Sequence, residues 1–443
     1  MKSFIGLTIG RFKSAPRLRR TLYLLCVALI GLYGFSIFAF ASRPLWNYVN
    51  LAIGGAMVVM ILVYELIYED IRLDEYCLLL FGFCWCVLFA SLMNGVGGSI
   101  SKSLFTQAAF GVALYQFAKN PNHLRDALVS FFVGGTAFAL YFVVHYWNDL
   151  THFSITDFSS RLGSFFDNEN NIARAFVFLG LLSFYFVLCK KQWWLVVHTV
   201  GMAFLTLSTG SISNLLCFVI GIIAILFFTF KGRQRWIVLA ALVVLAVIII
   251  AILRLPSLSY LSSRLENMIY SLFGFGGGDR SANERFELAK DAFLFFLDSP
   301  IFGHGYNYVA EHSVGFFAHN NFLEILADYG LFALVFFETM LIIPFLRLRK
   351  HRGSIKVFIG STLIYLFVFQ LFLVTYYTKI DHIIISFAFA ATSRSRIASV
   401  FVNFRKRKLN MGFEWNISDV RKKDFFEKKS MNPRVIDIDH FSI

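Results

Sequence analysis

The sequence predicts an all-helical protein that crosses a membrane many times, and its composition, its apolar block length and its charge placement support this fold class. Of its 443 residues, 58% are hydrophobic and 15% are charged, whereas ordinary soluble domains have roughly 45–50% apolar and about 25% charged residues. The apolar residues form long blocks without the short periods of an amphipathic helix or a half-buried strand, and mean hydropathy is +0.66. These features exclude a soluble globular protein.

The lengths of the apolar blocks set the predicted spans. Taking about 20 apolar residues per crossing gives about twelve membrane helices. The first block follows a basic N-terminus, residues 1–20, but it is too long for a signal peptide and more spans follow it, so we expect an uncleaved first span. Nine spans fall within 21–253 and three within 320–396. The predicted spans are 21–41, 46–68, 76–96, 99–118, 127–147, 172–189, 193–210, 212–230, 236–253, 320–346, 356–377 and 380–393.

The positive charge is concentrated at the two ends of the chain, which together hold most of the net charge of +14. Residues 1–20 contain six basic and no acidic residues, and residues 393–443, which include the tail 397–443, contain twelve basic and six acidic residues. Between the spans, basic connections alternate with less basic ones, and the basic ones fall on the same side of the membrane as the two ends. The positive-inside rule therefore predicts that both termini are cytoplasmic. The connection 69–75 fits least well, because it carries only Arg72 among four acids. Membrane topology accounts for the basic residues, and no nucleic-acid partner is predicted.

The sequence predicts no metal site, disulfide or cofactor. The three histidines of one exterior connection, His304, His312 and His319, have spacings of eight and seven residues, which match no H-E-x-x-H pattern. The cysteines all lie in apolar stretches, where they pack as small hydrophobic side chains: Cys26, Cys77, Cys84, Cys86, Cys189 and Cys217.

The longest exterior connection, 254–319, contains a predicted helix. Ser281 and Glu284 form a capping box, and the apolar pattern that follows runs to Asp298, just before a Ser-Pro pair. This places Arg285 in the first turn, where a cation gains nothing from the helix dipole. An anionic ligand could favour Arg285 there, and so could a local ion pair with a neighbouring glutamate.

A second candidate group opens the tenth span. His319 lies at the outer mouth of this helix, where the positive helix end favours neutral imidazole, a form that can accept a proton. Asn320, Glu324 and Asp328 follow on one stripe, and ionisable residues entering the bilayer are functional candidates. Alternatively, the stripe is a structural network that ties the span to neighbours such as Arg174.

The other long exterior connection, 148–171, ends in a polar run that leads into the sixth span. Its asparagines are typical helix caps. Only two residues here are functional candidates, namely Arg161 in the connection and Arg174 one turn inside the sixth span.

The chain from Arg264 to Leu331 resembles the O-antigen ligase and polymerase superfamily of bacterial envelopes. The resemblance rests on Arg285 and its apolar helix, the turn Ser-Pro-Ile-Phe-Gly-His-Gly, and the helix opening His-Asn-Asn-Phe-Leu-Glu. It implies a GT-C-like, metal-independent glycosyltransferase that acts at the periplasmic face on glycans carried by undecaprenyl diphosphate. By this resemblance, Arg285 holds the diphosphate and His319 assists the acceptor hydroxyl, with Arg264 as a second phosphate contact.

The sequence departs from the family pattern at one point. Members often carry an arginine after the Ser/Thr-Gly-Ser turn that opens the eighth span, but here Ile212 follows Thr209-Gly210-Ser211. A second cation must then come from Arg174, Arg161 or Arg264. With Asn320 and Glu324, these arginines are the predicted substrate-binding residues, and Arg285 and His319 are the predicted catalytic pair.

The predicted function is polymerisation of lipid-linked repeat units of O-antigen, capsule or exopolysaccharide. The alternatives are an O-antigen ligase that transfers the glycan to lipid A-core or to protein, a polysaccharide transporter or flippase, and a scaffold for an assembly complex. We expect the bacterial inner membrane as location and the lipid-linked glycan and the bilayer as partners. A chain-length regulator and a flippase of the same pathway are further candidate partners.

Overall fold

The computed structural model describes residues 17–40, 44–69, 71, 73–95, 99–153, 161–240, 262–263, 266, 280–313, 317–350 and 353–393. Several predictions lie outside the described residues. They concern Arg264, the ninth span beyond residue 240, and the tail 397–443.

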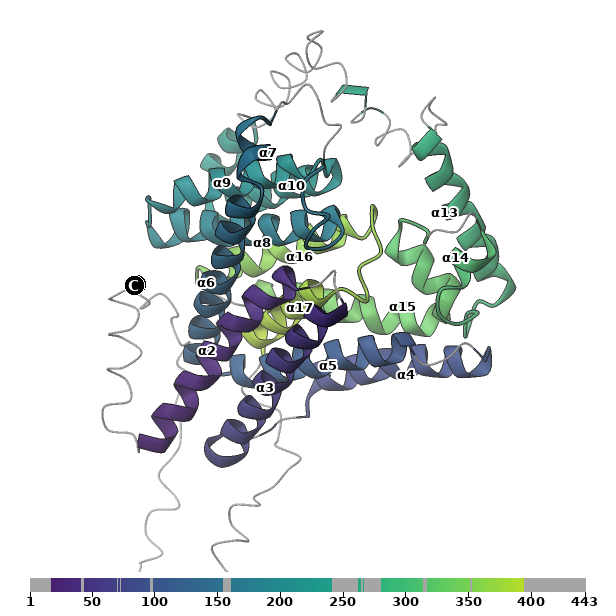
Figure 1. Cartoon of the computed structure of the whole chain (residues 1–443), viewed down its shortest axis with the longest axis horizontal. Helices are drawn as coiled ribbons and strands as arrows, with labels where there is room; N and C mark the ends of the chain where they lie inside the picture. Colours follow the sequence, from purple (N-terminus) through teal and green to yellow (C-terminus); the bar gives the residue numbers. More distant parts are fainter. Residues whose placement is uncertain are drawn as a thin grey trace, which may run out of the picture.

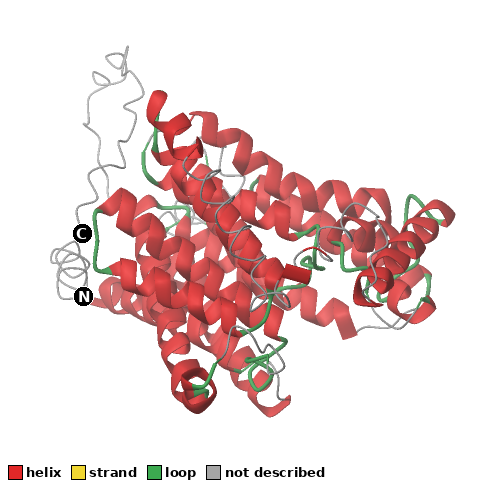
Figure 2. Ribbon diagram, turned by 90° about the horizontal axis from the view of Figure 1, so that it is seen from above, coloured by secondary structure: helices red, strands yellow, loops and turns green. Residues whose placement is uncertain are grey.

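The described chain is built of helices joined by short connections, and no strand occurs in it (Figure 2). The all-helical prediction is therefore confirmed. The helices are α2 (Arg17–Ala39), α3 (Pro44–Tyr68), α4 (Glu75–Met93), α5 (Ser99–Ala118), α6 (Pro121–His145), α7 (Trp147–Thr151), α8 (Glu169–Lys190), α9 (Leu195–Ser208), α10 (Ile212–Thr229), α13 (Arg280–Asp298), α14 (Tyr308–His312), α15 (Asn321–Arg347), α16 (Ile355–Phe369) and α17 (Lys379–Thr392).

Each predicted span other than the ninth coincides with one of these helices. Within the described residues, seven helices are long and apolar enough to cross a membrane, namely α2, α3, α4, α6, α8, α10 and α15. The helices α9 and α16 are apolar but shorter. The protein is thus a polytopic membrane protein.

Two predicted helix boundaries are wrong. The span 356–377 is helical only to Phe369, because the following segment turns back to bind the start of α15. The helix predicted from a cap at Ser281 begins at Arg280, so Ser281 lies inside it. Arg285 consequently lies in the second turn of α13 and not in the first.

Ion pairs join the connections at one end of the bundle. Arg19 lies 2.8 Å from Glu69, and Lys119 lies 2.8 Å from Glu65. The first contact compensates one acid of the connection 69–75, because Arg19, in the first turn of α2, pairs with Glu69.

The crossing of α2 and α6 depends on glycine (Figure 1). A Cβ atom at Gly134 would lie 1.8 Å from the carbonyl oxygen of Gly31, and one at Gly34 would lie 3.0 Å from the carbonyl oxygen of Phe131. Small residues let the two backbones touch, which is how helices associate in lipid, where hydrophobic burial gives no driving force between them.

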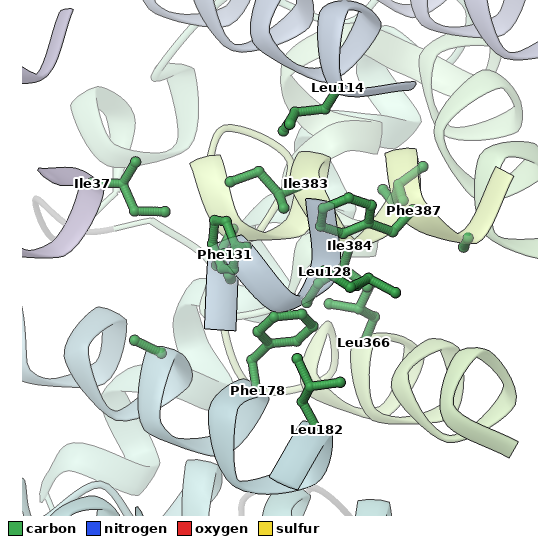
Figure 3. Packing of buried hydrophobic residues seen from close by; sticks show 14 of the residues in the cluster. Ile37, Leu114, Leu128, Phe131, Phe178, Leu182, Leu366, Ile383, Ile384 and Phe387 are labelled. Carbon is green, nitrogen blue, oxygen red and sulfur yellow. The ribbon is translucent and has the colours of Figure 1, made fainter. Parts of the chain in front are cut away.

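The short helix α17 lies at the centre of the bundle. Ile383, Ile384 and Phe387 of α17 pack among Phe131 of α6 and Phe178 of α8 (Figure 3). Nearly every residue of α17 is buried, so the helix is enclosed by protein. Polar residues at its N-terminal end, near Lys379, lie beside the middle of α5 and the start of α8.

We expect Gly134→Ala to lower the melting temperature of the protein in detergent, because the added methyl group forces α2 and α6 apart. Overpacking of this kind costs about 1–3 kcal/mol. Gly55→Ala is the matched control, since a Cβ atom at Gly55 of α3 would meet nothing within 4 Å. Equal melting temperatures for the two variants would contradict the backbone contact.

Candidate functional site

The tenth predicted span, α15, is broken at Gly330. Its φ of 78° and ψ of −176° are not helical, and the N–H of Leu331 donates to the carbonyl of Pro300 at 2.9 Å. The break leaves the carbonyls of Ala327 and Asp328 without their usual helical donors. The backbone N–H groups of His304 and Gly305 bind these carbonyls at 3.0 and 2.7 Å.

Glycine is required on both sides of this contact. A Cβ atom at Gly330 would lie 2.2 Å from the carbonyl oxygen of Ile301, and one at Gly303 would lie 2.4 Å from the carbonyl oxygen of Asp328. Both residues also have positive φ, which disfavours any residue with a side chain. The turn Ser-Pro-Ile-Phe-Gly-His-Gly therefore contacts the broken helix directly and hydrogen bonds to it.

Two carboxylates of α15 hold the rest of this loop. Asp328 accepts from the N–H groups of Asn307 at 3.1 Å and Val309 at 3.4 Å, where α14 begins. Glu324 accepts from the N–H of Ala318 at 2.6 Å. Both carboxylates are buried. Their stripe thus anchors the loop, and it does so through backbone N–H groups and not through Arg174.

Asparagines fix the start of α15. Asn320 caps the helix, because its side-chain oxygen accepts from the N–H groups of Phe322 at 3.0 Å and Leu323 at 3.2 Å. Asn321 is fully buried. Its side chain donates to Gln370 at 2.6 Å and accepts from the N–H of Thr375 at 2.7 Å. The segment after α16 is therefore wrapped around Asn321.

His319 lies between Ala318, whose N–H donates to Glu324, and Asn320, which caps α15. Its φ of 52° is left-handed, which turns the chain sharply at this point. Burial, and to a smaller extent the positive charge of Arg285, lower the pKa of His319 to about 4. The guanidinium on α13 therefore lies within electrostatic range of the imidazole, and His319 is neutral at physiological pH.

The environment of His319 leaves one ring nitrogen without a described partner. Nδ1 is buried and hydrogen bonds to none of the residues that the structure describes, although buried polar atoms nearly always have a partner. The ring is otherwise partly exposed and contacts Phe317, with ring centroids 4.6 Å apart. Arg285 is half-buried.

Two of the other predicted arginines, Arg174 and Arg161, are bound within the protein. Arg174 is 1% exposed, and its Nη1 donates to Thr378 Oγ1 at 2.6 Å and to Asp381 Oδ2 at 3.2 Å. Arg161 donates through Nε to the carbonyl of Thr209 at 3.1 Å. Arg161 thus closes the turn between α9 and α10, and Arg174 joins α8 to α17.

A cavity of about 120 Å³, which the sequence did not predict, is lined by polar and apolar residues from the C-terminal end of α2, the middle of α5 and the N-terminal ends of α8 and α17. The sequence contained one signal for it. Lys379 is a cation at the outer end of a span, where the positive-inside rule disfavours one. The polar side chains that line the cavity are Gln107, Asp167, Asn171, Tyr377, Thr378 and Lys379.

A search for metal sites found no group of three histidine, cysteine or carboxylate side chains that could hold a metal ion among the residues that the structure describes. Glu324 and Asp328, the two acids that follow His319 in the first turns of α15, bind backbone N–H groups.

Comparison with protein families identifies the region around the broken helix. Residues 194–337 match the family model of the O-antigen ligase. The match confirms the resemblance to the O-antigen ligase and polymerase superfamily. It covers about a third of the chain, from α9 to the middle of α15, and contains both Arg285 and His319. No curated protein matches the chain.

The O-antigen ligase region therefore includes the loop, the helix break and the neutral histidine, whereas Arg161, Arg174 and Lys379 lie outside it. These three residues belong to helices and connections that pack beside the family region.

Arg285→Gln should raise the pKa of His319 from about 4 toward the ordinary value of 6.5. The reason is that the guanidinium repels the imidazolium, so removing its charge makes protonation easier, while burial still holds the pKa below 6.5. Histidine NMR of the purified protein across pH 3–8 measures the shift.

The control for this measurement is Lys290→Gln, which removes an exposed cation from the same helix. The pKa of His319 should not change in this variant. An unchanged pKa in Arg285→Gln would mean that the two side chains are not coupled.

Proposed function

We propose that this protein is a membrane glycosyltransferase that polymerises undecaprenyl-diphosphate-linked oligosaccharide repeat units at the periplasmic face of the bacterial inner membrane, with both termini cytoplasmic. The observation that carries the proposal is a neutral imidazole, His319, within electrostatic range of the guanidinium of Arg285, both inside the region that matches the O-antigen ligase family model. O-antigen, capsule and exopolysaccharide repeat units are the substrate class. The supporting partners are the lipid bilayer, a flippase and a chain-length regulator.

In the proposed reaction, an acceptor sugar hydroxyl attacks the anomeric carbon of the donor glycan. The new bond joins that carbon to the acceptor oxygen, and the bond between the carbon and the phosphate oxygen breaks. His319 accepts the hydroxyl proton. Undecaprenyl diphosphate leaves with the bonding electron pair, and Arg285 stabilises its growing negative charge.

The depressed pKa of His319 suits a site that is completed by its substrate. A base with a pKa of about 4 is always available at neutral pH but accepts a proton weakly. A diphosphate bound to Arg285 would offset the guanidinium charge and raise the pKa of the imidazole. Donor binding would then make His319 a stronger base.

Because Arg285 supplies positive charge beside the leaving group, we propose that the reaction needs no divalent cation. The lipid-linked donor also accounts for the position of the site. The polyprenyl chain can remain in the bilayer while its phosphates meet α13 and the start of α15.

The second candidate is an O-antigen ligase that transfers the glycan to lipid A-core or to protein. The matching family model, which is described as O-antigen ligase, favours this candidate. The modest exterior loop and the missing arginine after Ser211 favour the polymerase. Deleting the gene separates the two, because loss of a polymerase leaves single-repeat caps and loss of a ligase leaves unattached lipid-linked polymer.

The purified protein in nanodiscs should convert undecaprenyl-diphosphate repeat units into a ladder of longer glycans on a gel, with EDTA present. His319→Ala should reduce the rate by about 10²-fold or more, the typical contribution of acid–base catalysis. Lys290→Gln is the control and should match the unaltered protein. A ladder of undiminished intensity from His319→Ala would remove the histidine from the mechanism.

The pH dependence should differ between the free and donor-bound enzyme. The acidic fall in kcat/KM reports the pKa of His319 in the free enzyme and should lie near pH 4. The acidic fall in kcat reports the pKa of His319 in the donor complex and should lie at higher pH. Initial rates from pH 3 to 8 at low and saturating donor measure both. Two falls at the same pH would show that the donor does not change the charge around His319.

A further inference from the structure

The polar cavity lies beside the family region, at the outer end of the bundle core. Ile37 and Phe38, near the end of α2, form one wall, and Ile380 of α17 contributes another apolar surface. The cavity has a volume of about 120 Å³ and is partly open. It therefore offers a bounded space with apolar walls and a polar lining, the usual form of a small-molecule site.

The hydrogen-bonding groups of the cavity are held in fixed orientations. Asp167 Oδ1 accepts from the N–H of Asn168 at 2.7 Å, and Oδ2 accepts from Asn171 Nδ2 at 3.2 Å. Lys379 makes no hydrogen bond or ion pair with any side chain in the described part of the chain, although the charge of Asp167 attracts it. The lysine can therefore donate to a ligand.

The charges of the cavity favour an uncharged ligand. Lys379 and Asp167 balance one another, and a phosphate placed between them would meet a carboxylate as well as an ammonium group. Sugar hydroxyls both donate and accept hydrogen bonds, so they can satisfy Lys379, Asp167 and the amide of Asn171 together. The lining therefore matches the hydroxyl groups of a saccharide better than a diphosphate.

The cavity is electrostatically connected to the loop that carries His319. Burial raises the pKa of Tyr377 to about 12, and the carboxylate of Glu324 contributes to the shift. The phenol stays protonated at neutral pH and remains a hydrogen-bond donor. The segment that carries Tyr377 also contacts the start of α15, because the N–H of Tyr376 donates to Asn321, two residues after His319, at 3.0 Å.

Arg174 binds Thr378, one of the residues that line the cavity. Its Nη1 donates to Thr378, a lining residue, and to Asp381 one turn further along α17. Its guanidinium also lies 4.2 Å from the ring centroid of Phe369. The buried arginine, which the sequence analysis placed among the substrate-binding residues, thus positions Tyr377 and Lys379.

We propose that the cavity is a subsite for an uncharged sugar of the acceptor glycan, with Lys379, Asp167 and Asn171 hydrogen bonding to its hydroxyl groups. This inference rests on the proposed glycosyltransferase function. It assigns the phosphates of the donor to Arg285 and the acceptor sugar to the end of α17. His319 would lie between the two substrates.

The test uses Lys379→Met and Asp167→Asn in the full-length protein in nanodiscs. The probe is the soluble repeat-unit oligosaccharide released from the polysaccharide of the producing cell. Loss of one or two hydrogen bonds should weaken oligosaccharide binding by about 10-fold or more, measured by calorimetry. In the glycan elongation assay the KM for this acceptor should rise by a similar factor, while the KM for the donor stays constant.

Controls separate binding from folding. Lys290→Met, an exposed lysine of α13, should bind the oligosaccharide like the unaltered protein, and Lys379→Arg should recover part of the loss. All variants should keep their melting temperatures. If Lys379→Met does not fold, Asp167→Asn decides, because it preserves the shape of the side chain.

The outcomes distinguish the subsite from the proposed function. Unchanged oligosaccharide affinity in both variants would overturn the subsite, even if elongation is observed. Displacement of the oligosaccharide by inorganic pyrophosphate would also overturn it, because the cavity would then be a phosphate site. Weakened oligosaccharide binding in a protein that never elongates glycans would uphold the subsite while the polymerase proposal fails.

Discussion

The break in α15 at Gly330 is the feature on which the outer face of the protein depends. A helix interrupted inside an apolar environment exposes carbonyl groups that must find donors, since an unsatisfied group there costs several kcal/mol. The donors come from His304 and Gly305 of the loop that precedes α15. The hydrogen bonds that satisfy the interrupted helix are therefore the same ones that attach this loop to it.

Buried polar side chains extend this attachment along α15 and α17. Asp328 and Glu324 bind loop N–H groups, Asn321 binds the segment after α16, and Arg174 binds Asp381. A buried ion pair adds little stability in itself, because desolvation offsets the attraction, but leaving one partner alone is costly. The network thus favours a single arrangement of the outer helix ends.

This arrangement separates two chemical environments that a transfer between glycans requires. Around His319, burial and the nearby guanidinium of Arg285 keep the imidazole neutral. Around Lys379 a lysine and an aspartate balance one another and border a space lined by amides and a phenol. An anionic leaving group suits the first environment and hydroxyl groups suit the second. The segment before α17 contacts the start of α15, because the N–H of Tyr376 donates to Asn321 at 3.0 Å.

The sequence by itself determined the fold class and the positions of most helices, because hydropathy acts locally along the chain. It also singled out His319 and Arg285, whose catalytic roles remain proposals. Only the tertiary structure decided that Glu324 and Asp328 bind the loop, that Arg174 pairs with Asp381, and that Lys379 faces a cavity. Those contacts join residues such as 174 and 381 that are 207 positions apart, and no local pattern in an apolar sequence specifies which distant polar group a buried side chain will meet.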